Sequence, residues 1–249
     1  MRNFVWRIAP IFLLTVRQFS GGKAVRAVLG LALVPTLFAA VYRVNPDVNR
    51  PRRFLDDSIL QVLLPTILPL AALVLATATF GDEIEDRTLP YLVLKPVSRL
   101  KIVFEKMMAS VIVSTPIIAL GVLISWFLVF MRDSRDNTDM LWATLASVVV
   151  GVVLYTCVFQ LLSLLIRRAI LASIVYSLVW ETVLGRFIPG LRYLSIRQVV
   201  TSVYTSVLDD RRLGTNNAFS TGGALIGAVV VCVIAIALST WRLNKLNIE

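Results

Sequence analysis

Long uncharged apolar runs alternate along this chain with short charged segments. A helix needs about 20 mostly apolar residues to cross a bilayer, so each long run is a candidate membrane span. Pro65 and Pro69 lie inside the second run and predict a kink or local unwinding there. The pattern predicts an all-α, polytopic membrane protein with a single transmembrane domain over residues 1–249. Its six predicted transmembrane helices are 27–42, 58–80, 107–131, 140–166, 169–188 and 219–241.

Two further segments place apolar residues on one helical face only. Residues 1–23 predict an N-terminal interfacial helix that ends at Gly21-Gly22. A signal peptide is the alternative, but its apolar core would cover only residues 8–16, and no clear cleavage site follows. Residues 44–57 are expected to form a polar turn, and residues 191–212 an outer amphipathic helix between the fifth and sixth spans. The apolar face of that outer helix comprises Ile196, Val199, Val200, Val203 and Val207.

The segment 81–106, between the second and third spans, is the most charged part of the chain, with ten charged residues. Charge at this density predicts that the segment lies in water or among lipid headgroups. Ser98 is a candidate cap for a helix that leads into the third span. An ordinary loop with solvated charges fits this pattern equally well on spacing alone.

A short helix is predicted inside this segment. Leu89, Leu92 and Val93 recur at i, i+3 and i+4, which places them on one helical face. Thr88 suits the N-cap, and Pro96 is expected to end the helix. The segment therefore reads as a compact protrusion between two long spans.

A motif runs through the protrusion: Glu83-x-Glu85-x-x-Thr88-Leu89, then Leu92, Leu94, Pro96-Val97-Ser98-Arg99 and Lys106. It resembles the loop after the second span of type-2 ABC exporter permeases, in which a cytoplasmic coupling helix docks on the ATP-hydrolysing subunit. Arg87 stands where that family usually has Gly. The resemblance implies that the residues docking on the ATPase subunit are Glu83, Glu85, Asp86, Arg87, Thr88, Leu89, Leu92, Pro96 and Arg99.

A second motif, Tyr176-x-x-x-Trp180-Glu181 followed by Pro189-Gly190-x-x-Tyr193-Leu194-Ser195, is similar to the fifth span and outer exit of a bacterial branch of the same family. Glu181 is the one carboxylate deep in a predicted span. A charge there costs about 2.5–3.5 kcal/mol, so it should face protein or water, or be protonated. Both a substrate or gating role and a structural hydrogen-bonding role fit this intramembrane polar residue.

Composition supports the membrane assignment. Apolar residues make up 57% of the chain, and the net charge is +10. The mean hydropathy is +0.81. The cations sit mainly at the ends of apolar runs, where anionic headgroups attract them, so nucleic-acid binding is not expected. Cys157 and Cys232 lie far apart inside apolar runs and are interpreted as small buried hydrophobes rather than a disulfide or metal pair.

Little in the sequence points to covalent chemistry. The chain has no His and no Gly-x-x-x-x-Gly-Lys-Ser/Thr phosphate loop, so we expect no catalytic residues, no metal site and no ATP hydrolysis by this chain alone. The acidic run Asp82-Glu83-Glu85-Asp86 is a weak candidate for a divalent cation. The resemblance implies that ATP and Mg are bound by a partner subunit instead.

The function implied by the resemblance is the permease subunit of an ATP-driven ABC exporter. Its partners would be a nucleotide-binding ATPase subunit, a second permease subunit in a homodimer or heterodimer, and membrane lipid. Its location would be a bacterial or archaeal cytoplasmic membrane, with both termini cytoplasmic; 14 of the 25 Lys and Arg residues then face inward. The alternatives are a self-contained channel or secondary transporter that uses Glu181, and an intramembrane enzyme, whose usual His or paired aspartates are missing.

Overall fold

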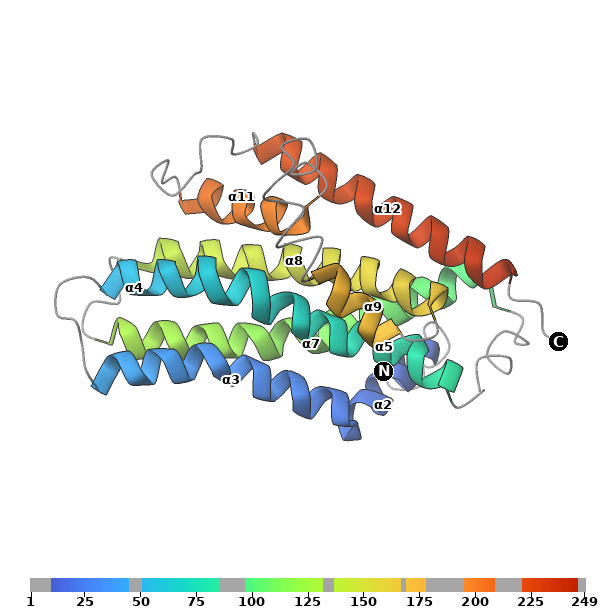
Figure 1. The fold of residues 1–249 in the computed structure, drawn as a ribbon, viewed down its shortest axis with the longest axis horizontal. Coiled ribbons are helices and arrows are strands. Elements are labelled where there is room, and N and C mark those ends of the chain that lie inside the picture. Colours follow the sequence, from blue (N-terminus) through green and yellow to red (C-terminus); the bar gives the residue numbers. More distant parts are fainter. Residues whose placement is uncertain are drawn as a thin grey trace.

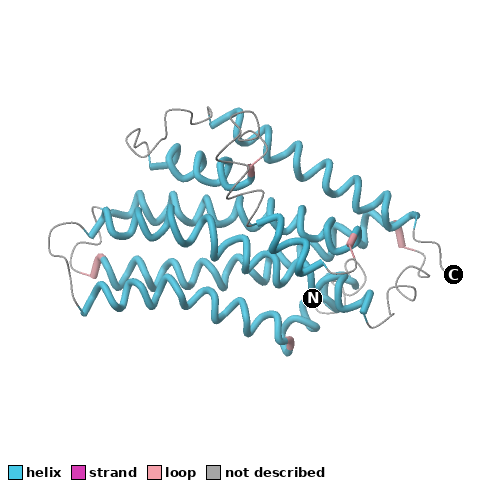
Figure 2. Tube along the Cα trace, in the orientation of Figure 1, coloured by secondary structure: helices cyan, strands magenta, loops and turns pink. Residues whose placement is uncertain are grey.

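The computed structural model describes residues 10–44, 51–85, 97–131, 137–166, 169–177, 195–208 and 221–245, and within these ranges the regular structure is entirely helical (Figures 1 and 2). The all-α prediction is confirmed. The elements are α2 (Pro10–Gly21), α3 (Lys23–Val44), α4 (Pro51–Ser58), the π-helix η1 (Ile59–Ile67), α5 (Leu68–Glu85), α7 (Arg99–Val129), α8 (Thr138–Leu165), α9 (Ala169–Val175), α11 (Ile196–Leu208) and α12 (Thr221–Lys245).

Among the described residues, five helical stretches are long and apolar enough to cross a membrane: Lys23–Val44, Pro51–Gly81, Arg99–Val129, Thr138–Leu165 and Ile226–Lys245. They correspond to the first four predicted spans and the last. The structure describes the fifth predicted span, 169–188, only as far as residue 177. The α-helix in this part is α9, which has seven residues. A sixth span therefore stays a prediction.

The second span begins earlier than the sequence predicts. Part of the expected polar turn at 44–57 is the helix α4, which continues without a break into η1 and α5. Pro65 lies inside η1, and the Leu68 amide donates to the Leu63 carbonyl five residues back. Proline lacks an N–H and crowds the carbonyl one turn earlier, so a widened π turn accommodates it. The predicted local departure from α geometry is confirmed in this form.

The central charged segment is shorter than the predicted 81–106. At one end α5 continues to Glu85, and at the other α7 begins at Arg99, eight residues before the predicted third span. Ser98 occupies the N-cap position with extended backbone angles, but its side chain makes no capping hydrogen bond. The predicted N-cap position of Ser98 is therefore confirmed, whereas a capping hydrogen bond from its side chain is not found.

Two stretches form the centre of the bundle. In the most apolar windows of Pro51–Gly81 and Thr138–Leu165, 61% of residues are buried, against 17–28% in the other three candidate spans. The helix α3 packs closely on α7, where a Cβ at Gly121 would collide with the backbone carbonyl of Ala32. Inner helices therefore lie between outer ones whose apolar faces remain exposed within this single chain.

The helix α11 lies against α8 and α12 (Figure 1). Four of the five residues predicted on its apolar face are buried, whereas Val207 is 47% exposed. Tyr204, which the apolar pattern did not select, is fully buried. Its phenol donates a 2.5 Å hydrogen bond to the Asp56 carboxylate on α4, which brings a polar residue into this face.

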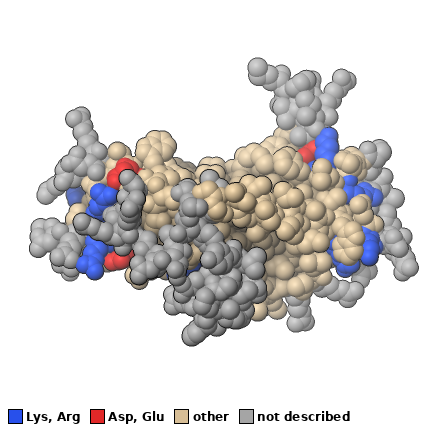
Figure 3. All heavy atoms as spheres, turned by 90° about the horizontal axis from the view of Figure 1, so that it is seen from above, with Lys and Arg blue, Asp and Glu red and all other residues tan. Residues whose placement is uncertain are grey.

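On the face that Figure 3 shows, the charged side chains of the described residues gather towards the two ends of the molecule, and the described residues between them are uncharged. This distribution suits a protein that crosses a membrane along its long axis. We call the segment 86–96, which connects α5 to α7, the central loop. The helices α2 and α12 meet at the end of the molecule where α5 and α7 approach this segment. They are the described elements nearest the two chain ends.

Candidate functional site at the base of the central loop

The structure describes three of the residues predicted to dock on an ATPase subunit. Glu83 lies in the last turn of α5, Glu85 is the last residue of that helix, and Arg99 is the first residue of α7. They border the two ends of the loop 86–96. The docking role of all these residues stays a prediction. The predicted residues that lie outside the described ranges are Asp86, Arg87, Thr88, Leu89, Leu92 and Pro96, together with the intramembrane Glu181.

An ion pair closes the base of this loop. The Lys106 ammonium on α7 lies 2.7 Å from a Glu83 carboxylate oxygen on α5, and the Lys106 side chain is 1% exposed. The same ammonium donates to the Thr79 carbonyl and lies 4.6 Å from the centre of the Phe80 ring. A buried ammonium is tolerable only when it is paired and hydrogen-bonded, and these contacts meet that requirement.

A second carboxylate joins α7 to the N-terminal helix. One Glu105 oxygen accepts hydrogen bonds of 3.0 Å from the backbone amides of both Ile11 and Phe12. These amides belong to the first turn of α2, where N–H groups lack partners within the helix and a negative charge is favourable. The other Glu105 oxygen lies 3.6 Å from the Lys101 ammonium. Glu105 therefore caps a helix that is distant in sequence.

The burial of Glu105 and Lys106 corrects the expectation that the whole segment 81–106 lies in water or headgroups. They are 6% and 1% exposed. They directly precede the uncharged third span, and Ile102 and Val103 one turn earlier are buried too. Their helical spacing from these apolar residues is the sequence signal that could have indicated their burial, although not their partners.

An apolar cluster surrounds these polar contacts and joins five helices. Gln160 on α8 donates to the Val103 carbonyl at 3.3 Å, and Arg242 on α12 donates to the Leu164 carbonyl at 3.4 Å. We name the cluster and the Glu83–Lys106 and Glu105–α2 contacts together the loop brace. The buried apolar residues of the loop brace are Ile11, Phe80, Ile102, Val103, Leu164 and Leu243.

The opposite end of the bundle is also tied by polar contacts. Arg52 and Asp139 form a 2.8 Å ion pair between α4 and α8, in which both side chains are more than 40% exposed. Burial and the hydrogen bond to Asp56 raise the pKa of Tyr204 well above its usual range. The phenol therefore stays protonated and acts there as a donor.

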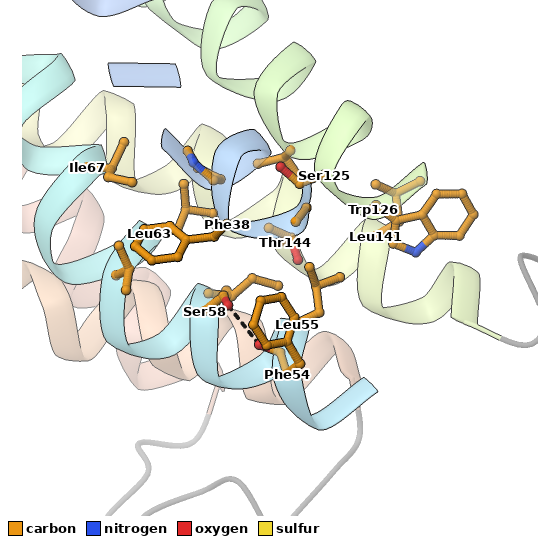
Figure 4. A pocket seen from close by; sticks show the side chains of 15 residues that line it. Phe38, Phe54, Leu55, Ser58, Leu63, Ile67, Ser125, Trp126, Leu141 and Thr144 are labelled. Atoms are coloured by element: carbon orange, nitrogen blue, oxygen red, sulfur yellow. Dashed lines mark hydrogen bonds between the residues drawn. The ribbon is translucent and has the colours of Figure 1, made fainter. Parts of the chain in front are cut away.

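Two hollows differ in what they can hold. Near the α4 end, an apolar cavity of about 20 Å³ lies between α3, the α4–η1 segment, α7 and α8, with Phe38, Leu63 and Trp126 in its wall (Figure 4). That volume has room for about one water molecule. An open hollow of about 520 Å³ lies between the α2–α3 junction, α5 and α9, with Lys23 and Thr77 among its lining. Only the second is in the size range of ligand pockets.

The contacts at the base of the loop join its two ends to each other and to two membrane-crossing helices. A comparison with protein families matches residues 23–185 to the model described as ABC-2 family transporter protein. The match covers more than half of the chain, so this protein belongs to the ABC-2 transporter family and is a multi-pass membrane permease. No curated protein matched the chain.

Proposed function

We propose that this chain is the membrane subunit of an ATP-driven ABC exporter, and that its loop 86–96 receives the motion of a separate ATPase subunit in the cytoplasm. Family membership supports the permease class. The observation that carries the coupling role is the loop brace, because it joins both ends of the loop to each other and to the N-terminal helix.

The brace explains how a push on the loop would reach the membrane. The helices α5 and α7 enter and leave the loop, and the Glu83–Lys106 pair joins them across its base. A displacement therefore moves both helices together rather than bending the loop. Because Glu105 holds the first turn of α2, the N-terminal helix moves with them. Packed elements transmit such shifts as rigid bodies.

A second permease subunit is part of this proposal. The helices α3, α7 and α12 expose large apolar residues, such as Leu37, Phe127 and Ile226. Lipid covers such faces, and so does a second transmembrane subunit. The open hollow of about 520 Å³ beside α5 and α9 is large enough to admit a cargo molecule from the loop end.

Co-purification tests the docking role. The chain is co-expressed with its proposed ATPase subunit, and the amount of ATPase retained is compared for wild type, Leu89→Asp and Val44→Asp. Val44 is the control because it is 87% exposed at the opposite end of α3. A buried charge at a docking surface should lower retention by at least about tenfold for Leu89→Asp and leave Val44→Asp unchanged. Full retention and full transport in Leu89→Asp would refute the docking role.

A further inference from the structure

Three sulfur atoms meet in the interior of the bundle. The Cys157 thiol on α8 lies 3.4 Å from the Cys232 thiol on α12, although the two residues are 75 positions apart. The same Cys157 sulfur lies 3.3 Å from the Met107 thioether on α7. The two cysteines do not form a disulfide in the structure. Separation along the chain suggested two unrelated hydrophobes, but packing of α8 against α7 and α12 brings them together.

The surroundings of these sulfurs are apolar. Cys157 is 2% exposed and Met107 is 6% exposed, while Cys232 is half-buried. They form one cluster with Ala235, and the partly buried side chains packed on it are Met108, Val153, Leu161 and Ile236. The side chains of this cluster carry no oxygen atom that could bind a hard, strongly hydrated cation. Their thiol and thioether sulfurs are the ligands that a soft cation prefers.

We propose that Cys157, Cys232 and Met107 form a binding site for a monovalent soft metal ion, Cu(I) or Ag(I). Thiolate and thioether sulfur are the ligand types that select Cu(I) over harder metals. The Met107 thioether distinguishes a metal site from a disulfide. A disulfide between the two cysteines would involve only two sulfur atoms, whereas a three-coordinate soft cation binds three.

The required rearrangement is small. An ion in a trigonal plane with metal–sulfur bonds of about 2.3 Å separates its sulfurs by about 4.0 Å. The observed contacts of 3.3 and 3.4 Å must therefore open by about 0.6–0.7 Å, which side-chain rotation supplies. Met107 is unbranched and Cys232 is only half-buried, so both have freedom to move.

Charge balance determines how many protons the two cysteines keep when the ion is bound. An apolar interior penalises net charge, so the favoured complex is neutral, with one thiolate, one thiol and one thioether around the monovalent cation. Binding then forms three metal–sulfur contacts and releases one proton from a cysteine to the solvent. No electron is transferred. The apparent affinity should rise about tenfold for each unit increase in pH. The rise should end at the pH where the metal-free cysteine already loses this proton.

Silver binding to the purified full-length chain in lipid nanodiscs tests the site. Ag(I) is added under anaerobic, thiol-free conditions, and bound metal is counted after gel filtration for wild type, Cys157→Ala, Cys232→Ala and Met107→Leu. Met140→Leu is the control, because Met140 is a fully buried thioether of the main core and lies outside the sulfur cluster. We expect one ion per chain in wild type and Met140→Leu, loss of binding in both cysteine variants, and at least about tenfold weaker binding in Met107→Leu.

A wild-type measurement makes the test independent of whether the variants fold. Ag(I) should raise the midpoint of thermal unfolding of the wild-type chain, because a ligand that binds the native state stabilises it. Absence of bound silver in the wild type, equal binding in Met107→Leu, or recovery of a Cys157–Cys232 disulfide from anaerobic preparations would overturn the proposal. None of these measurements depends on an ATPase partner, so the site stands or falls separately from the coupling role.

Discussion

Replacing Lys106 by Met tests the loop brace most sharply. Methionine keeps an unbranched side chain of similar length and removes the ammonium that contacts Glu83, the Thr79 carbonyl and the Phe80 ring. Removing one partner of a buried ion pair costs about 3–5 kcal/mol. Since the Glu83 side chain is 19% exposed, water screens part of that loss, and we expect a cost of about 2–3 kcal/mol in the free energy of unfolding.

The assay is reversible unfolding in mixed micelles, followed by circular dichroism. The double variant Glu83→Gln with Lys106→Met also neutralises the carboxylate that faced the ammonium, and it should recover about 1 kcal/mol relative to the sum of the two single variants. Lys101→Met is the control. Lys101 is a 45% exposed lysine on the same helix, 3.6 Å from Glu105, and its loss should cost less than about 0.5 kcal/mol. Equal costs for the two lysine variants would show that the buried Lys106 contacts stabilise the protein no more than an exposed ion pair does.

Substitutions at three further contacts give the remaining predictions. Gly121→Ala should destabilise the protein by about 1–3 kcal/mol in the same unfolding assay, because its Cβ meets the α3 backbone, whereas Gly30→Ala, which meets nothing, should be neutral or stabilising; equal effects would contradict the close packing. Tyr204→Phe removes the phenol that donates to the Asp56 carboxylate and should cost about 1–3 kcal/mol. Because the folded-state pKa of Tyr204 is raised, wild-type stability should fall as pH rises above about 10, and an equally steep fall in the Phe variant would contradict this. Glu105→Gln should speed hydrogen exchange at the start of α2 by about fivefold, and unchanged exchange rates would show that the carboxylate is no cap.

The membrane-crossing helices could be predicted because the length of an uncharged apolar run is enough to indicate them. The fourth predicted span, 140–166, differs from α8 by two residues at its start and one at its end. Boundaries failed where polar residues are helical. The Arg52-Arg53 pair and Asp56-Asp57 suggested a turn, yet α4 is helical there and pairs Arg52 with Asp139 across the bundle.

The brace was harder to predict, because it depends on contacts between residues far apart in sequence. Glu105 faces amides 93 and 94 residues away, and no local spacing indicates that pairing. Lys106 and Glu83 were visible as charges near apolar runs, but a charge count cannot distinguish a solvated lysine from a buried one. The contact between Cys157 and Cys232 was missed for the same reason: it exists only once α8 and α12 pack together.

The side of the membrane on which residues 86–96 lie tests the central proposal most directly. In a chain whose two native cysteines are alanine, Lys95→Cys and Val44→Cys are exposed separately to a membrane-impermeant maleimide. Val44 lies at the far end of α3, which makes it the matched position on the opposite side. We expect that Val44→Cys reacts in intact cells, while Lys95→Cys reacts only after the cells are permeabilised. Labelling of Lys95→Cys in intact cells would contradict it.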